Sequence, residues 1–196
     1  MDGGNRPPLP SFVEGDPNKT TTRDSNMPAD VGNRERRAIS PELDARIAAM
    51  DYTPEELANI ETTIRFRSLD RPFKREDLVS IISKEYKATH HGMDALIAVT
   101  GDAKGYTQES MNDRRDTIVD IIAKGDRIWV YFRMDGHHTG RWFGQEASGK
   151  PISMHELGIF RFKDGLIIEA AFMGEELELA RQLGIVPTTQ PPKAAH

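Results

Sequence analysis

The 196-residue sequence contains no cysteine, which excludes disulfide bonds, thiolate nucleophiles and thiolate metal sites. It also lacks an apolar run of about 18 residues, so we expect no membrane-spanning helix. The formal net charge of −5 argues against nucleic acid as a partner, because nucleic-acid-binding proteins usually carry a basic face. No charged-then-apolar leader opens the chain, and with the missing cysteines this leads us to expect a cytoplasmic protein.

Motifs for several reaction classes are missing as well. There is no glycine-rich phosphate loop and no GxSxG segment, which excludes nucleotide hydrolysis of the usual kind and the usual serine hydrolases. No HxxxH or HxH spacing occurs, and the neighbours His137 and His138 should point apart on an extended segment. We therefore expect no metal and no cofactor, and any chemistry must come from ordinary side chains.

The pattern of residues divides the chain into three parts. Residues 1–50 are rich in proline, glycine and polar residues near their start, and we expect an extension there. It is either disordered or an arm on a neighbouring subunit, anchored by Phe12, Val13 and Ile39. Residues 51–187 should form one α+β domain, and residues 188–196 a flexible tail.

Helix signals come early in the chain. Ser40 and Pro41 begin a first helix, and the capping box from Thr53 to Glu56 begins a second that should run to about Leu69. We expect a third helix over residues 75–84, with three inward residues: Leu78, Ile81 and Ile82. The apolar segment 93–99 is compatible with a helix or with part of a lid. A last helix should start near residue 175 and end at Gly184, with these residues inward: Leu177, Ala180 and Leu183.

Strand signals dominate the second half. We expect strands over residues 85–91, 117–123, 127–135, 152–162 and 166–172, with an Asp164-Gly165 hairpin turn between the last two. Because side chains alternate along a strand, residues 127–135 should turn an apolar face inward: Ile128, Val130, Phe132 and Met134.

Three sequence blocks in the second half of the chain carry a family resemblance: HTGRWFGQEASGKPI from His138, GIFRFKDGLIIE from Gly158 and LELARQLG from Leu177. These blocks resemble the SnoaL-like polyketide cyclases. The resemblance covers about residues 57–184. It implies a nuclear transport factor 2-like fold, in which a cone-shaped, bent antiparallel sheet with packed helices surrounds a deep apolar pocket for a bulky, often aromatic ligand. It also implies a homo-oligomer of two or more subunits.

The same resemblance implies a departure from the family's chemistry. The family's catalytic histidine corresponds to Gly158 and its catalytic aspartate to Phe172. Neither glycine nor phenylalanine can transfer a proton, so a cyclisation by the usual acid is not expected.

Other residues must then supply the acid and the base. If Gly158 faces the pocket, strand alternation places Glu156 there too, and a carboxyl group in apolar surroundings can act as general acid or base near neutral pH. His90 or His91 is the expected partner, since adjacent residues of a strand point to opposite faces. Tyr86 shares a face with His90 and could donate to an oxyanion. The expected substrate-binding residues are Phe132, Met134, His138, Met154, Phe160 and Phe172.

The expected function is a cofactor-independent acid–base enzyme acting on a bulky aromatic small molecule. Because the cyclase aspartate is missing, we favour a lyase that cleaves a C–C or C–O bond, by deformylation or dehydration of a hydroxylated aromatic compound. The alternatives are an isomerase or cyclase of polyketide type, and a non-catalytic module that binds a small molecule.

Overall fold

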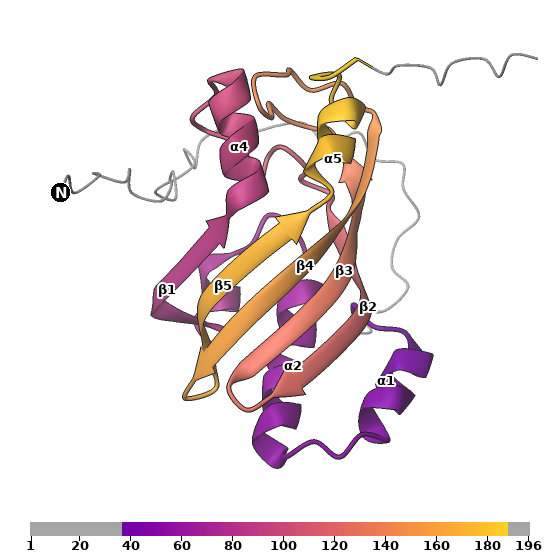
Figure 1. Ribbon diagram of the computed structural model, residues 1–196, viewed down its shortest axis with the longest axis vertical. Helices are drawn as coiled ribbons and strands as arrows, with labels where there is room; N and C mark the ends of the chain where they lie inside the picture. The colour runs from indigo at the N-terminus through magenta and orange to yellow at the C-terminus, as the bar shows by residue number, and fades with distance from the viewer. Residues whose placement is uncertain (1–36, 188–196) are drawn as a thin grey trace, which may run out of the picture. The chain divides into compact units, whose positions relative to one another are not determined.

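A five-stranded sheet organises residues 37–187, the part of the chain that this computed structural model describes (Figure 1). The strand order is β1-β5-β4-β3-β2. The strands are β1 (Ile82–His90), β2 (Arg115–Lys124), β3 (Arg127–His137), β4 (Pro151–Lys163) and β5 (Leu166–Gly174). The helices are α1 (Pro41–Ala48), α2 (Pro54–Ser68), α3 (Arg75–Leu78), α4 (His91–Thr100) and α5 (Glu176–Gln182). The α+β class is thus confirmed.

The sheet is mixed and not wholly antiparallel as expected. The pairs β2–β3, β3–β4 and β4–β5 are antiparallel, but β1 runs parallel to β5 at the edge. A hairpin turn fixes the direction of antiparallel neighbours, whereas β1 and β5 are joined only through the intervening strands. Their relative direction therefore had no local signal in the sequence.

The first two predicted helices are present with the predicted caps. Thr53 N donates to Glu56 Oε2 at 2.9 Å and Glu56 N donates to Thr53 Oγ1 at 3.2 Å, which completes the capping box of α2. In α1, Leu43 and Ile47 are buried in the same core as the sheet. The domain therefore begins before α1, and a boundary at residue 50 is too late. Residues 1–36, with Phe12 and Val13, and the tail 188–196 lie outside the described residues.

The helix predicted over residues 75–84 is wrong in its second half. α3 ends at Leu78, and β1 begins at Ile82, which pairs with Ile167 of β5. Ile81 already accepts a backbone hydrogen bond from Ile167 N at 2.9 Å. Short apolar runs fit either period, and here the open edge of β5 stabilises the extended form of two β-branched residues.

α5 also differs in which residues it buries. Leu177 was expected inward but is 75% exposed, whereas Leu179 and Ala180 are fully buried. The buried face is completed by Leu183, and the turn at Gly184 has a positive φ of 78° as a helix-ending glycine requires. A seven-residue helix has room for only one buried face, and its true start decides which leucine lies on it.

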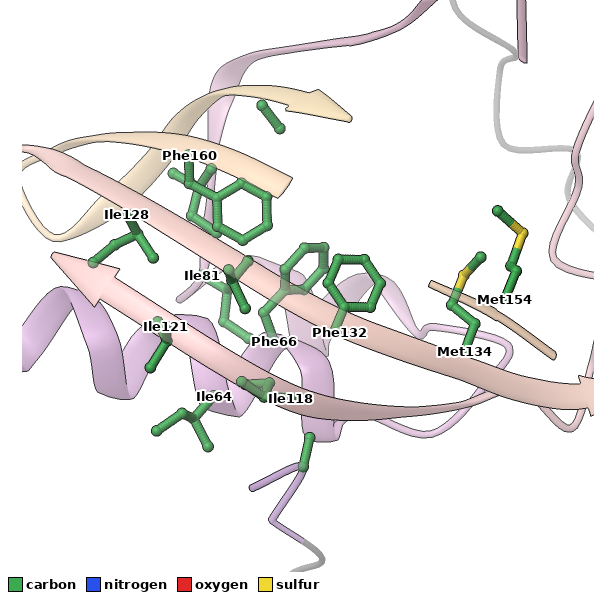
Figure 2. Packing of buried hydrophobic residues seen from close by; sticks show 14 of the residues in the cluster. Ile64, Phe66, Ile81, Ile118, Ile121, Ile128, Phe132, Met134, Met154 and Phe160 are labelled. Carbon is green, nitrogen blue, oxygen red and sulfur yellow. The ribbon is translucent and has the colours of Figure 1, made fainter. Parts of the chain in front are cut away.

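The inward face of the sheet forms the core together with α2 (Figure 2). On β3, the predicted inward residues Ile128, Val130, Phe132 and Met134 are all at most 2% exposed. Met134 and Met154 are partners across β3 and β4 and lie next to each other in Figure 2. Phe66 of α2 packs against Phe160 of β4, with 6.1 Å between their ring centroids. Within residues 37–187, no helix is long and apolar enough to cross a membrane.

Candidate functional site

A histidine and a glutamate meet on the inward face of the sheet. His90 ends β1 and Glu156 lies in the middle of β4, and Nε2 of the histidine is 2.7 Å from Oε1 of the glutamate. The Glu156 side chain is 6% exposed and the His90 side chain 19% exposed. The two side chains therefore form a pair that is largely shielded from water but reachable from one side.

The start of α4 orients the His90 ring. His90 is the N-cap of α4, and its Nδ1 accepts a hydrogen bond from Met93 N at 3.4 Å. If Nδ1 accepts, the neutral ring carries its proton on Nε2 and donates it to the Glu156 carboxylate. Among the described residues, no hydrogen bond reaches the second carboxylate oxygen of Glu156, so this oxygen is available for a substrate proton.

A second glutamate approaches the same ring from α5. Glu176 Oε1 accepts from Gly174 N at 2.8 Å and lies 3.5 Å from His90 Nδ1. Gly92 makes this approach possible, because a Cβ at residue 92 would lie 2.1 Å from Glu176 Cδ. The sequence analysis predicted a helix start near residue 175 but missed the contact of Glu176 with His90.

The structure distinguishes the two adjacent histidines. His91 is exposed as the first residue of α4, while His90 reaches the core. Tyr86 shares the inward face of β1 with His90, as predicted, and packs against the core. Burial raises the pKa of Tyr86 to about 12, against the opposing positive charge of Arg67. The Tyr86 phenol therefore stays protonated at neutral pH and can donate a hydrogen bond.

Five of the six predicted substrate-binding residues surround this pair. Phe172 stacks on His90 with 5.9 Å between ring centroids, and it meets Phe160 edge-on at 5.8 Å. Phe132 is the direct cross-strand partner of Glu156. Met134 and Met154 continue the same face and are almost fully buried.

The sixth, His138, lies in the loop after β3, and no contact with the pair is formed within the described chain. Its backbone N donates to Lys150 O and its carbonyl accepts from Gly149 N, both at 2.9 Å. Its Nδ1 is 3.1 Å from Ser148 Oγ, and burial lowers its pKa. These contacts order the loop, and a direct role in substrate binding stays a prediction.

Arg67 of α2 is a site residue that the sequence reasoning missed. Its side chain is 3% exposed, and its guanidinium carbon lies 3.8 Å from the centroid of Phe132 and 5.3 Å from that of Phe172. The sequence does indicate that Arg67 lies on the apolar face of α2, because residue 67 follows Ile64 by three positions and Ile60 by seven. A charged residue on such a face is costly to bury and calls for an explanation.

One carboxylate stands among three guanidinium groups beside this site. Asp116 of β2 accepts from Arg67 Nη1 at 3.2 Å, from Arg71 Nη2 at 3.4 Å and from Arg114 Nε at 2.7 Å. Burial alone would raise the pKa of Asp116, but the charges of Arg114 and Arg67 outweigh it and hold the pKa at about 2. Asp116 is therefore ionised at neutral pH and fixes the position of Arg67.

Gly158 and Phe172 stand at the two positions to which the resemblance assigns the family's catalytic histidine and aspartate. Gly158 and Phe172 are direct partners across β4 and β5. A Cβ on Gly158 would lie 3.2 Å from the Phe172 ring and 3.3 Å from both the Phe160 ring and Val130, so these side chains occupy the space that a side chain at residue 158 would need. Within residues 37–187, no group of three or more His, Asp or Glu side chains could hold a metal ion.

Comparisons with known proteins agree with this fold. A putative SnoaL-like polyketide cyclase from Jannaschia sp. CCS1 aligns with a TM-score of 0.55 and 19% identity, over 70% of this chain and 99% of that one. AclR, a putative hydroxylase from Streptomyces galilaeus, aligns with a TM-score of 0.56 and 16% identity, over 69% and 86%. IdmH, a putative polyketide cyclase from Streptomyces antibioticus, aligns with a TM-score of 0.50 and 21% identity, over 64% and 98%. No curated protein matches the sequence.

At these identities the structures show the fold alone, but the sequence also matches a family. The description of that family is SnoaL-like polyketide cyclase, and the match covers residues 85–183, from β1 to the end of α5. This stretch contains His90, Glu156, Phe172 and Glu176. The chain belongs to the SnoaL-like polyketide cyclase family.

Proposed function

We propose that this protein is a cofactor-independent acid–base lyase that removes water or formaldehyde from a hydroxylated aromatic compound. The observation that carries the proposal is the 2.7 Å contact between His90 Nε2 and Glu156 Oε1 inside a ring of aromatic and methionine side chains. Family membership supports an enzyme of the cyclase or isomerase type in general. The cleavage reaction rests on the replacement of the family's acid by Phe172.

The pair has the parts that such a cleavage needs. In a dehydration, Glu156 takes a proton from a substrate carbon, the hydroxyl leaves as water with the Nε2 proton of His90, and the proton on Glu156 replaces it so that the ring ends neutral. In a deformylation, Glu156 takes the hydroxyl proton, the C–C bond breaks to release formaldehyde, the carbon takes the Nε2 proton of His90, and the proton on Glu156 again replaces it. Neither reaction changes the oxidation state overall, so neither needs an electron acceptor.

The experiment is a screen of hydroxylated aryl compounds by mass spectrometry for the loss of water or formaldehyde. We expect Glu156→Gln and His90→Ala each to lower turnover by about 100-fold or more, since positioned proton transfer contributes roughly that much. His155 offers a matched control, because it lies on the same strand as Glu156 and forms an exposed contact at 3.3 Å with Glu175, the N-cap of α5. His155→Ala should leave turnover unchanged, and unchanged turnover in both site variants would refute the proposal.

An isomerase or cyclase of polyketide type is the second candidate, and the family match favours it. The same screen separates the two, because an isomerisation leaves the mass of the compound unchanged. A cytoplasmic location, a homo-oligomeric state and a small-molecule substrate stay predictions.

A further inference from the structure

Arg67 is buried, and within residues 37–187 two of its three guanidinium nitrogens form no hydrogen bond. Nη1 donates to Asp116, but within residues 37–187 no acceptor lies within reach of Nε or Nη2, and both atoms are shielded from water. Leaving a buried charged donor without an acceptor is costly, so such an atom in a native fold needs a reason.

The two unused donors are neighbours on the guanidinium and form its side-on fork. This is the edge that binds both oxygens of a carboxylate in a bidentate pair. The same chain shows the arrangement in Arg114, whose Nε and Nη2 donate to the two oxygens of Asp116 at 2.7 and 3.1 Å. Arg161 uses the same two atoms toward Glu169.

The aromatic rings around Arg67 do not explain the unused edge. The rings of Phe66, Phe132, Phe160 and Phe172 lie 3.8–5.3 Å from its guanidinium carbon. A cation–π contact supplies no oxygen or nitrogen acceptor to the N–H groups of the guanidinium. The rings do hold the guanidinium in place, which lowers the entropy that a bound anion would have to offset.

The local charge balance favours a further anion. Arg67, Arg71 and Arg114 are at most 9% exposed and share one carboxylate, that of Asp116. Glu156 also attracts Arg67 electrostatically but forms its hydrogen bond with His90. Even with Glu156 counted, this cluster keeps one positive charge more than it has negative charges.

The unused edge also adjoins the proposed reaction site. Phe132 contacts the guanidinium and is the cross-strand partner of Glu156. Phe172 contacts both the guanidinium and the His90 ring. Phe132 and Phe172 therefore connect the guanidinium of Arg67 to the glutamate and the histidine.

We propose that the Nε and Nη2 edge of Arg67 binds a carboxylate, so that the ligand of this site is an aromatic carboxylic acid in its anionic form. The substrate class rests on the proposed function, because it assumes that the ligand at Arg67 is the one that His90 and Glu156 act on. The binding itself does not depend on turnover.

The test compares two probes of equal shape, 2-naphthoate and its neutral amide, by titration calorimetry. We expect millimolar or tighter binding of the naphthoate and at least about tenfold weaker binding of the amide, as the loss of a charge-assisted pair implies. Arg67→Met should reduce naphthoate binding to the level of the amide. Arg67→Lys, which keeps the charge but lacks the fork, should fall between the two.

Arg65→Met is the matched control, since Arg65 is an exposed residue of the same helix. The Arg67→Met protein should fold, because Asp116 keeps Arg71 and Arg114 as partners. Equal binding of acid and amide, no binding of either, or unchanged naphthoate binding in Arg67→Met would each overturn the inference. A failure of the proposed reaction would appear instead as unchanged turnover in Glu156→Gln, whatever the probes do.

Discussion

Asp116→Asn should lower the free energy of unfolding more than any exposed carboxylate change on the same strand. The Asp116 side chain is 1% exposed, and the substitution removes the negative charge that Arg67, Arg71 and Arg114 share. Removing one partner of a buried ion pair typically costs about 3–5 kcal/mol, because the remaining charge stays buried. We expect a loss in this range at neutral pH.

The pKa of Asp116 fixes the part of this loss that depends on pH. The folded-state pKa of about 2 lies below the ordinary value of 3.8. A gap of about two pKa units corresponds to about 2–3 kcal/mol of stability. Because the folded pKa is depressed, this stabilisation is present above about pH 4 and is lost as the pH falls toward 2. The asparagine variant cannot be protonated in this way and should lack that change.

The assay is urea unfolding of both proteins over a series of pH values, followed by circular dichroism. The difference in the free energy of unfolding should shrink by about 2 kcal/mol as the pH falls from roughly 5 to 2. Asp120→Asn is the control, because Asp120 lies on β2 in an exposed pair with Arg46 and should cost less than about 1 kcal/mol. A loss below about 1 kcal/mol for Asp116→Asn, or a difference that does not vary with pH, would show that the carboxylate does not hold the three guanidinium groups as described.

Two further predictions follow from buried groups of the same face. Burial raises the pKa of Tyr86 to about 12, so in a spectrophotometric titration Tyr86→Phe should remove a phenol that ionises near pH 12; removal of a phenol with the ordinary value near 10 would contradict this. Gly158→Ala should cost more stability in the wild-type protein than in a Phe172→Ala background, since the new Cβ would lie 3.2 Å from the Phe172 ring. Equal costs in the two backgrounds, measured by thermal or urea unfolding, would show that the ring does not limit the space at residue 158.

The sequence predicted the inward faces well, because alternation is a strict consequence of strand geometry. β3 and β4 bury the residues that alternation assigned, including the carboxylate of Glu156 among apolar neighbours. The sequence did not decide which of His90 and His91 faces inward, since alternation places adjacent residues on opposite faces without showing which face is buried. The start of α4 at His91 decides this, because it ends the strand with His90 on the inward face.

Other features could not be derived from local patterns. The contact of Glu176 with His90 joins residues 86 positions apart in sequence, and it needs the missing side chains of Gly92 and Gly174. Likewise, no hairpin turn joins β1 to β5, so no local pattern indicates their parallel pairing. Arg67 is a different case, because helical periodicity places it beside Ile60 and Ile64. The same period therefore indicates a charged residue on the apolar face of α2.

The catalytic positions of the family and the pair observed here lie within the same part of the sheet. His90, Phe172 and Gly158 follow one another across β1, β5 and β4 as direct register partners. The histidine that the family resemblance implies at residue 158 is thus found two strands away in the same row. The carboxylate is found at Glu156, two residues from Gly158 on the same face of β4.

This arrangement gives Phe172 a role that a simple loss of the family's acid does not explain. Its ring stacks on His90, contacts the guanidinium of Arg67 and occupies the space over Gly158. An aspartate there would leave that space empty and add a third carboxylate next to Glu156 and Glu176, both of which already contact His90. Two neighbouring carboxylates disfavour each other's charge, and a third would compete for the one imidazole. The phenylalanine therefore fits the proposed site, in which His90 and Glu156 form the acid–base pair and Phe172 is part of the aromatic wall.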